Sequence, residues 1–469
     1  RYCCGGSSLA HLWAQVVKRM PRACSIPFLV GIVLFISALV IVVEWRAVHD
    51  ISSYESLTHA MLLPTLRAKL ANYSVMHPAA GVGERGLAGL RGSTRLGRHT
   101  SQVAEEKHLD GAFGDRPNTG VPDLRNLEPN NGVFDAPPFP TPPEVRHWKC
   151  TQAVWDNTKL PTIAMVIPYL HEQWVQMEKT IASILTYTPP ELLDEILFID
   201  DDNSADWAFH EHLTAIHPKI RVHRNDERQG LIKAKVTGAA LTTSPVIVFM
   251  EPHCIVNPHW LEPLLVQLMQ SHNHSTIVMP TLDIIPETDF NVYKRAKYHI
   301  GGFDWSLTFN WMDLVKDRNK SHIMPEPYAT PALSGGVFGV WRDFWEQQGK
   351  YDTQMTEWGG EHIEMSLRTW RCGGRIEIVP CSHIGHVFRA KNPYPVHISQ
   401  VLRNIKRAAV VWLDEYLERF YEENPGARAL DAGDVSDRLA LKKRLGCKSM
   451  EWYIQNVYPE LTGTQPRRR

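Results

Sequence analysis

Between residues 162 and 250 the sequence alternates short apolar runs with a stretch of helical periodicity. The apolar runs lie at Thr162–Ile167, Glu195–Ile199 and Val246–Met250, and apolar side chains recur at helical spacing between Trp174 and Leu185. A strand, a helix and a second strand within about forty residues indicate a βαβ unit, whose strands are parallel. The sequence therefore predicts an α/β fold with a doubly wound, Rossmann-like nucleotide-binding half.

The same pattern continues with a strand at Ile220–His223 and an Ala-rich helix at Leu231–Leu241. Acidic residues, Asp200-Asp-Asp-Asn203, follow the second strand, and ligands of open α/β sheets bind at the carboxyl ends of strands. Neither the G-x-G-x-x-G fingerprint nor a G-x-x-x-x-G-K-[ST] phosphate loop is present. A nucleotide's phosphates must therefore be held in another way.

Glu251 and His253 follow the strand Val246–Met250 directly. Side chains at i and i+2 on an extended chain point to the same side, so both can reach one cation. A divalent cation held there would bind the phosphates. The alternative is a buried strand that turns into a surface loop at Glu251-Pro252-His253, because such short patterns are common.

An uncharged segment from Ala23 to Val43 is 21 residues long, which is about the length needed to cross a bilayer as a helix. Lys18, Arg19 and Arg22 precede it, and positive charge marks the cytosolic side, so we expect the bulk of the chain to be lumenal. A cleaved signal peptide is the alternative, but no small-residue cleavage pattern follows the segment directly.

Five cysteines lie beyond this segment, an odd number, so at least one is expected to be free or paired outside the chain. A lumenal chain could be glycosylated at three sequons, which begin at Asn72, Asn273 and Asn319. The 50 basic and 51 acidic residues nearly cancel, and no basic stripe is interleaved with aromatics. Nucleic acid is therefore not an expected partner.

Aromatic residues and paired glycines crowd the sequence after Pro280, in segments 301–311, 330–340 and 357–362. Paired glycines let backbone approach a ligand closely, although a loop-rich core with structural glycines has the same appearance. Cys381, His383 and His386 are possible zinc ligands, but no second cluster completes such a site, so we do not predict zinc. Helical spacing then runs from Val401 through Tyr416.

From about Lys149 to Leu461 the chain resembles the catalytic domain of the UDP-GalNAc:polypeptide N-acetylgalactosaminyltransferases. The motifs that carry this resemblance are Thr188-Pro-Pro-Glu-Leu-Leu193, Arg228-Gln-Gly-Leu-Ile-Lys-Ala-Lys235, Phe303-Asp-Trp305, Trp358-Gly-Gly-Glu361, Gly385-His-Val-Phe-Arg389 and Cys447-Lys-Ser449. The resemblance implies a GT-A-type glycosyltransferase fold, with a Rossmann-like nucleotide-binding half and an acceptor-binding half. It also implies Mn²⁺, UDP-GalNAc as donor, and transfer with retention to Ser or Thr of a polypeptide in the Golgi.

The resemblance also assigns roles to individual residues. It implies that Glu251, His253 and His386 are the metal ligands and that Glu361 is the acidic residue near the sugar. The resemblance further implies that Phe303 and Trp305 contact the acceptor peptide. The residues that it implies for donor binding are Asp201, Arg228, Trp358, Arg389 and Tyr394.

The resemblance further implies disulfides that join Cys150 to Cys381 and Cys372 to Cys447, leaving Cys254 unpaired. The expected organisation is a cytosolic tail, a type II membrane anchor, a stem, a catalytic domain without the family's lectin domain, and a short basic tail. These parts span residues 1–22, 23–43, 44–145, 146–461 and 462–469, respectively.

Several positions depart from the family pattern. Glu251-Pro252-His253 stands where the family has Asp-Ser-His, and the first strand ends Pro168-Tyr-Leu-His-Glu172 instead of Thr-Phe-His-Asn-Glu. Ser334, His362 and Asn392 replace Ala, Asn and His, respectively. Two hypotheses follow: an active, lectin-less transferase, or a catalytically weakened paralogue that binds peptide or partner transferases without turnover.

Overall fold

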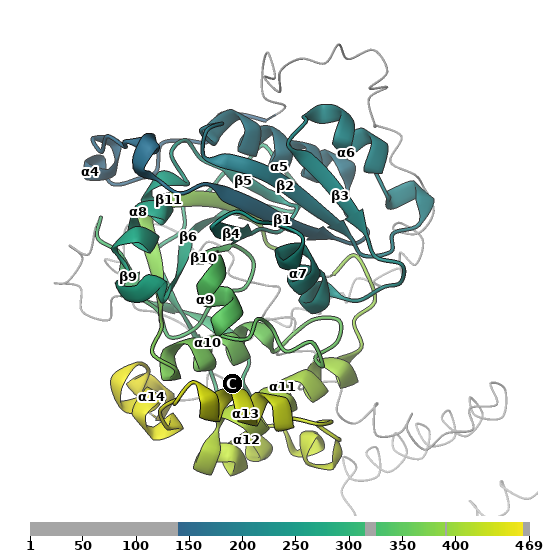
Figure 1. Ribbon diagram of the computed structural model, residues 1–469, viewed down its shortest axis with the longest axis vertical. Coiled ribbons are helices and arrows are strands. Elements are labelled where there is room, and N and C mark those ends of the chain that lie inside the picture. The colour runs from purple at the N-terminus through teal and green to yellow at the C-terminus, as the bar shows by residue number, and fades with distance from the viewer. Residues whose placement is uncertain (1–138, 315–324, 390–391, 463–469) are drawn as a thin grey trace, which may run out of the picture. The chain divides into compact units, whose positions relative to one another are not determined.

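The computed structural model describes residues 139–314, 325–389 and 392–462 (Figure 1). All of them belong to one compact unit of the chain, residues 68–469. Within these ranges no helix has the length and apolar character needed to cross a bilayer. The membrane segment predicted at residues 23–43 lies outside the described residues, as do the cytosolic tail and most of the predicted stem.

The described strands form a nine-stranded mixed sheet and a separate two-stranded sheet. The large sheet has the order β3-β2-β1-β4-β10-β6-β11-β5, with β9 paired to β11, and the small one is β7-β8. The strands are β1 (Ile163–Tyr169), β2 (Leu193–Asp200), β3 (Ile220–Arg224), β4 (Val246–Phe249), β5 (Cys254–Val256), β6 (Thr276–Ile285), β7 (His299–Phe303), β8 (Phe309–Asp313), β9 (Tyr328–Ala329), β10 (Phe338–Trp341) and β11 (Arg375–Val387).

Strands β1 to β4 are parallel, which confirms the predicted α/β nucleotide-binding half. Strand β1 is buried along its whole length, as expected for a parallel strand that is covered on both faces. Helix α7 (Leu231–Ala240) packs on β1 and β2. A Cβ on Gly238 would lie 2.4 Å from a methyl group of Val166, so only glycine permits this close packing of helix and strand.

In the other half of the sheet, strands that are distant in sequence lie next to one another, which local periodicity does not predict. Strand β10 lies antiparallel between β4 and β6, whereas β6 and β11 are parallel. Strand β5 pairs antiparallel with the end of β11 and brings His386 opposite Cys254. This register places the end of β11 beside the segment that follows β4.

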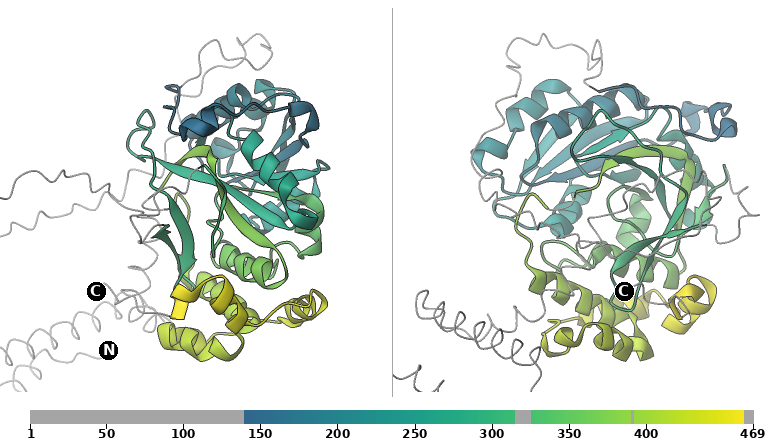
Figure 2. Two further views of the ribbon diagram at one scale, coloured as in Figure 1. Left: turned by 90° about the vertical axis from the view of Figure 1, so that its left-hand side faces the viewer. Right: turned by 180° about the vertical axis from the view of Figure 1, so that it is seen from behind.

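The remaining helices are α4 (Trp148–Thr151), α5 (Trp174–Tyr187), α6 (His210–Ile216), α8 (Glu262–Gln270), α9 (Arg342–Gln347), α10 (Glu361–Arg371), α11 (Ile398–Trp412), α12 (Leu417–Glu423), α13 (Ser436–Arg444) and α14 (Met450–Asn456). Some of these helices cover the sheet. Others, α11 to α14, form a C-terminal group that lies together at the yellow end of the chain in Figures 1 and 2.

Helix α11 ends earlier than its apolar spacing suggests. The spacing continues to Tyr416, but the helix stops at Trp412. Asp414 adopts a left-handed conformation, with φ of 49°, and a non-glycine residue in that conformation cannot continue a right-handed helix. Tyr416 lies in a short 3-10 turn instead, where its ring stacks on Trp305 at 5.3 Å.

Disulfides join Cys150 to Cys381 and Cys372 to Cys447, the two pairs that the resemblance implies. Cys254 is buried and carries a free thiol. Phe139, which falls within the predicted stem, is buried in a small apolar cluster with Ile285 and Val387. The last residues of that stem segment therefore pack on the folded unit.

Candidate active site

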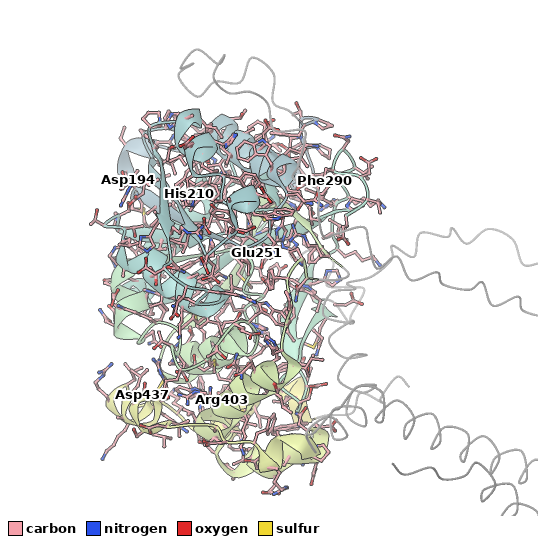
Figure 3. The ribbon with its side chains drawn as sticks, turned by 90° about the vertical axis from the view of Figure 1, so that its right-hand side faces the viewer. Asp194, His210, Glu251, Phe290, Arg403 and Asp437 are labelled. Atoms are coloured by element: carbon pink, nitrogen blue, oxygen red, sulfur yellow. A yellow bond between two sulfur atoms is a disulfide. The ribbon has the colours of Figure 1, made fainter. Side chains whose placement is uncertain are left out.

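A cleft opens at the carboxyl ends of the parallel strands, where Glu251 lies between the sheet and the C-terminal helices (Figure 3). This is the edge at which the sequence placed a ligand site. Eight of the predicted site residues line this cleft. They are Asp201, Arg228, Glu251, His253, Trp358, His386, Arg389 and Tyr394.

Glu251, His253 and His386 converge at the floor of the cleft. Glu251 Oε2 lies 2.6 Å from His386 Nε2 and 3.1 Å from His253 Nε2. One ligand atom from each residue lies within 4.8 Å of the others. The pairing of β5 with β11 explains the meeting, and the Val387 N–H donates to the His253 carbonyl across 3.2 Å.

Glu251 and His386 have pKa values that favour the forms in which they bind a cation, whereas His253 differs. Burial opposes ionisation of Glu251, but hydrogen bonds from His253 and His386 hold its pKa well below the usual range. Burial also lowers the pKa of His386, which favours its neutral form, and His386 Nδ1 has no hydrogen-bond partner among the residues that the structure describes. Burial opposes protonation of His253, but contacts with Glu172 and Glu251 raise its pKa overall. A carboxylate and two imidazoles are ligands that suit Mn²⁺ and related divalent ions.

Glu172 supports the site from behind, a role that sequence reasoning did not assign. Its Oε2 lies 3.3 Å from His253 Nδ1, so that the Nε2 of the same ring faces Glu251. Metal-binding histidines commonly have such a carboxylate on their second nitrogen. Both oxygens of Glu172 also accept from Arg389, which Gln176 contacts as well. Glu172 thus ties Arg389 to a candidate metal ligand.

Asp201 shapes the cleft by holding a loop. Its carboxylate accepts from the backbone N–H groups of Gln229 and Gly230, each at 2.8 Å, and from the Asn225 side chain at 2.9 Å. This loop presents Arg228, whose Nη2 donates to the Pro395 carbonyl at 3.1 Å. The buried Nε of Arg228 has no hydrogen-bond partner within the described part of the chain, which leaves it available to a ligand.

Glu361 does not line the cleft but lies beneath it at the start of α10, with an exposed fraction of 3%. Burial raises its pKa, but contacts with His362 and the charge of Lys235 lower it overall. The Lys235 ammonium group donates to the Gly335 carbonyl at 2.7 Å. A catalytic role for Glu361 remains a prediction.

The two predicted acceptor contacts lie outside the cleft. Phe303 is buried against Tyr453 and Tyr458, and the guanidinium group of Arg419 lies over the ring of Trp305. Phe309 and Trp311 from β8 line the cleft instead. Their i, i+2 spacing on a strand was visible in the sequence and could have identified them.

A smaller apolar pocket adjoins the cleft. The two share three lining residues, Leu282, Trp311 and Phe388. The rest of the smaller pocket consists of side chains of β6, β9 and β11, together with Ala296, Lys297 and His299. The cleft therefore continues into a surface that suits an extended, partly apolar ligand.

The structure agrees that Cys381, His383 and His386 do not form a zinc site. Cys381 is in a disulfide, and His383 Nδ1 pairs with the buried carboxylate of Asp283 at 2.8 Å. Among the positions that depart from the family pattern, Ser334 and Asn392 line the cleft. His362 is buried below it, with its ring 5.8 Å from that of Phe309.

The fold and this site define a glycosyltransferase of the GT-A class. Family models described as glycosyl transferase family 2 and as N-terminal domain of galactosyltransferase match residues 165–343 and 320–393. A solved structure titled "Crystal structure of GalNAc-T7 with UDP, GalNAc and Mn2+" superposes with a TM-score of 0.64 at 30% identity, covering 69% of this chain and 61% of that one.

The chain belongs to the polypeptide N-acetylgalactosaminyltransferase family. It is 36% identical to polypeptide N-acetylgalactosaminyltransferase 16 of Homo sapiens over 395 residues, which cover 80% of this chain and 70% of that protein. It is 40% identical to polypeptide N-acetylgalactosaminyltransferase 14 of Homo sapiens over 325 residues, covering 68% and 58%. The chain spans 54% to 70% of the length of these and other curated relatives.

Proposed function

We propose that this chain transfers GalNAc from UDP-GalNAc to Ser or Thr of polypeptides, with retention and with Mn²⁺ as cofactor. The single observation that carries the proposal is the convergence of Glu251, His253 and His386 at the floor of a cleft in this fold. Supporting it, the GalNAc-T7 structure that superposes on the chain holds UDP, GalNAc and Mn²⁺.

In this proposal, different residues of the cleft bind the cation, the diphosphate and the nucleotide. Glu251, His253 and His386 would hold the cation, which neutralises the diphosphate and stabilises the leaving UDP. Arg389 adds a positive charge, and Glu172 orients both Arg389 and His253. Arg228, Trp358 and Tyr394 enclose the nucleotide.

The acceptor peptide would enter past Phe309 and Trp311 into the adjoining apolar pocket. Aromatic and aliphatic walls bind an extended chain with little demand on its sequence, and they exclude water from the reaction. Phe303 and Trp305 would then act indirectly, because they pack on Tyr453 and Tyr416, respectively, and line neither pocket. The family also supports a Golgi setting, with the catalytic domain lumenal and a single N-terminal anchor.

One observation favours the alternative function, a paralogue that binds without turnover. Glu251 Oε2 already contacts both imidazoles directly, and its side chain is one methylene longer than the family's aspartate. A cation must fit between three ligand atoms that lie within 4.8 Å of one another. Poor fit would weaken metal binding and therefore turnover.

Titration of the full chain with UDP, in Mn²⁺ and separately in EDTA, tests the proposal. We expect UDP to bind at least about tenfold more tightly with Mn²⁺, because the ion is the main partner of the diphosphate. Equal UDP affinity in both solutions would overturn the metal-dependent mechanism.

A further inference from the structure

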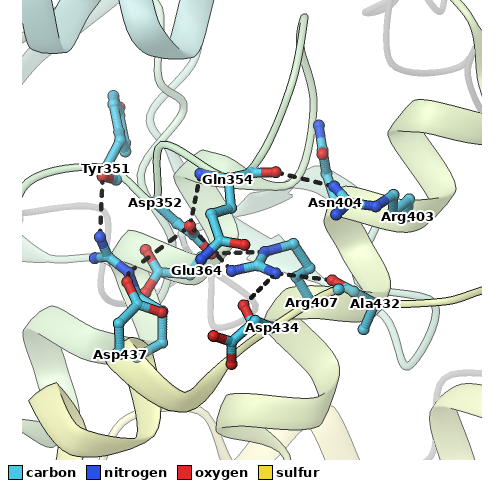
Figure 4. Close-up of polar contacts among 12 residues, drawn as sticks. Tyr351, Asp352, Gln354, Glu364, Arg403, Asn404, Arg407, Ala432, Asp434 and Asp437 are labelled. Atoms are coloured by element: carbon cyan, nitrogen blue, oxygen red, sulfur yellow. Dashed lines mark hydrogen bonds and ion pairs between the residues drawn. The ribbon is translucent and has the colours of Figure 1, made fainter.

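One face of α11 runs along the loop that contains Asp352 and Gln354 (Figure 4), and Trp358 follows in the same loop. Arg407 pairs with Asp352 at 2.9 Å, and Arg403 donates to the Gln354 carbonyl at 2.9 Å. Asn404 receives the Thr356 N–H at 3.0 Å and donates to the Thr356 carbonyl at 2.7 Å. These contacts fix residues 352–356, so the next residue, Glu357, has a defined position at the cleft.

The backbone of Glu357 is fixed from the opposite side. It forms an isolated bridge with Gly230, and a Cβ on Gly230 would lie 2.4 Å from Glu357 Cα. Gly230 is itself held by Asp201. Glu357 adopts a left-handed conformation, with φ of 57°, which is strained for a residue with a long side chain. Glu357 thus joins residues 352–356, which contact α11, to the loop that carries Arg228.

The side chain of Glu357 reaches a third segment. Its Oε1 lies 2.5 Å from His397 Nδ1, and its Oε2 accepts the His397 backbone N–H at 3.1 Å. His397 immediately precedes α11, and a carboxylate at a helix N-terminus is favoured by the helix dipole. The Glu357 side chain is 20% exposed and that of His397 is 62% exposed, so the contact lies at the edge of the cleft.

Residues 392–397, here called the wall segment, form one side of the cleft through Asn392, Pro393 and Tyr394. Arg228 holds the middle of this segment by donating to the Pro395 carbonyl, and its guanidinium group lies 5.4 Å from the centre of the Tyr394 ring. Glu357 holds its last residue. Among the described residues, the wall segment is therefore fastened at two points, and Glu357 fastens its end to the loop of Trp358.

We propose that Glu357 is a positioning residue that fastens the wall segment over the nucleotide cleft by binding His397. The proposal rests on the proposed function, because it assigns the ordered wall a role in binding UDP. Removing the carboxylate should leave the wall segment free to open, and UDP would then bind a state that is populated only part of the time.

The test compares Glu357→Ala, Glu357→Gln, His397→Ala and the double variant Glu357→Ala/His397→Ala in the full chain. His259→Ala is the matched control, since His259 also contacts a carboxylate, Glu262 at 2.8 Å, and its side chain is 56% exposed. Two quantities are measured: amide hydrogen exchange of residues 392–398 without ligand, and the dissociation constant of UDP with Mn²⁺.

We expect both single alanine variants to speed exchange across residues 392–398 and to weaken UDP binding by about fivefold, as for loss of one charged contact. The double variant should be no weaker than either single one, because both remove the same contact. Glu357→Gln should lose less of the affinity for UDP, since the amide oxygen of glutamine can still accept one hydrogen bond. The His259→Ala control should match the wild type in both measurements.

Unchanged exchange in Glu357→Ala and His397→Ala would overturn the proposal. Additive losses in the double variant would also overturn it, because Glu357 would then act on the ligand directly. If the wild-type chain does not bind UDP, the proposed function fails, whereas the exchange measurement still decides whether Glu357 fastens the wall segment.

Discussion

Glu251 shows at the scale of one residue how neighbours prepare a side chain for a cation. It is surrounded by two imidazoles, and hydrogen bonds from them keep its carboxylate ionised despite burial. The backbone around it is also fixed: Thr180 Oγ1 donates to the Pro252 carbonyl at 2.9 Å and accepts the Cys254 N–H at 3.0 Å. Small changes at these residues should therefore have large effects.

His386→Ala should lower the Mn²⁺-dependent affinity for UDP by about tenfold or more, since loss of one imidazole leaves the cation under-coordinated. Calorimetric titration with UDP measures the change. In EDTA the variant and the wild type should bind UDP equally, which controls for damage to the rest of the cleft. Wild-type affinity of the variant in Mn²⁺ would show that His386 is not a ligand.

The double substitution Glu251→Asp with Pro252→Ser should raise the turnover number if the departure from the family pattern is a geometric handicap. We expect a gain of about tenfold, because a misplacement of about one ångström can cost up to a hundredfold in rate. Steady-state transfer of GalNAc to a Ser/Thr peptide measures the change. A lower turnover number would show that this chain's cleft is adapted to Glu251.

At the scale of elements, α11 connects the cleft to the C-terminal helices through buried charges. Arg407 pairs with Asp352 and also donates to the carbonyls of Ala432 and Asp434, each at 2.8 Å. Asp414 joins three helices by accepting from Arg371, Lys442 and the Met450 N–H. These contacts link α11 and the segment that follows it to the loops on both sides.

Arg407→Ala should lower the free energy of unfolding by about 3–5 kcal/mol, because it removes the closer of the two arginines that pair with the buried Asp352 carboxylate. Denaturant unfolding of the variant and the wild type measures the loss. Arg428→Ala is the control, since it removes an ion pair with Glu418 that is exposed to solvent. That control should unfold almost as the wild type does. Similar losses in both variants would contradict the importance of the buried pair.

Asp414 should make stability depend on pH in the acid range. Burial raises its pKa, but Lys442, Arg371 and the Met450 N–H lower it below the ordinary value of 3.8. A carboxyl group with a lowered pKa stabilises the fold above its unfolded pKa, and this contribution is lost as pH falls through the lowered value.

The stability difference between the wild type and Asp414→Asn should therefore be constant above about pH 5 and should shrink as the pH falls below about 4. Denaturant unfolding at a series of pH values measures this difference. A difference that grows on acidification would have the wrong sign and would contradict the account.

At the scale of the whole molecule, the disulfides join distant parts of the chain. Cys150 and Cys381 are separated by 231 residues, so their bond ties the start of the folded unit to the strand that carries His386. The buried thiol of Cys254 lies in β5, the partner of that same strand. The strand that carries His386 is therefore held by a disulfide that lies outside the cleft.

Cys150→Ser with Cys381→Ser should lower the free energy of unfolding by about 2–5 kcal/mol, since it frees a long loop in the unfolded chain. Peptide mapping of the alkylated wild-type protein is the accompanying check. The Cys254 peptide should be alkylated only after denaturation. Alkylation of Cys254 in the native protein, or a disulfide that includes it, would contradict the structure.

The sequence predicted those parts of the fold that local patterns determine. The alternation between residues 162 and 250 was sufficient for the parallel strands β1 to β4, and Glu251 and His253 could be paired because they are two residues apart. The third candidate ligand could not be derived locally. His386 reaches the cleft through the pairing of β11 with β5 and β6, and only the family resemblance indicated it.

The aromatic residues that line the cleft show the same limit, and acceptor contacts by Phe303 and Trp305 stay a prediction. The Phe303-Asp-Trp305 motif is distinctive in sequence, but the pairing of β7 with β8 places Phe309 and Trp311 at the cleft instead. Strand register decides which aromatic residues face a ligand, and register depends on contacts between distant segments. The role of Glu357 likewise depends on three segments that meet only in the folded chain.

The most direct test of the central claim is transfer of GalNAc by the full chain from UDP-GalNAc to a mixed panel of Ser/Thr peptides, in Mn²⁺ and in EDTA. We predict product only with Mn²⁺, with the α-linkage of the donor retained in the glycopeptide, which NMR of the anomeric proton identifies. Mn²⁺-dependent binding of UDP without transfer to any peptide, in the wild type and in Glu251→Asp/Pro252→Ser, would contradict the claim and leave the chain as a binding paralogue.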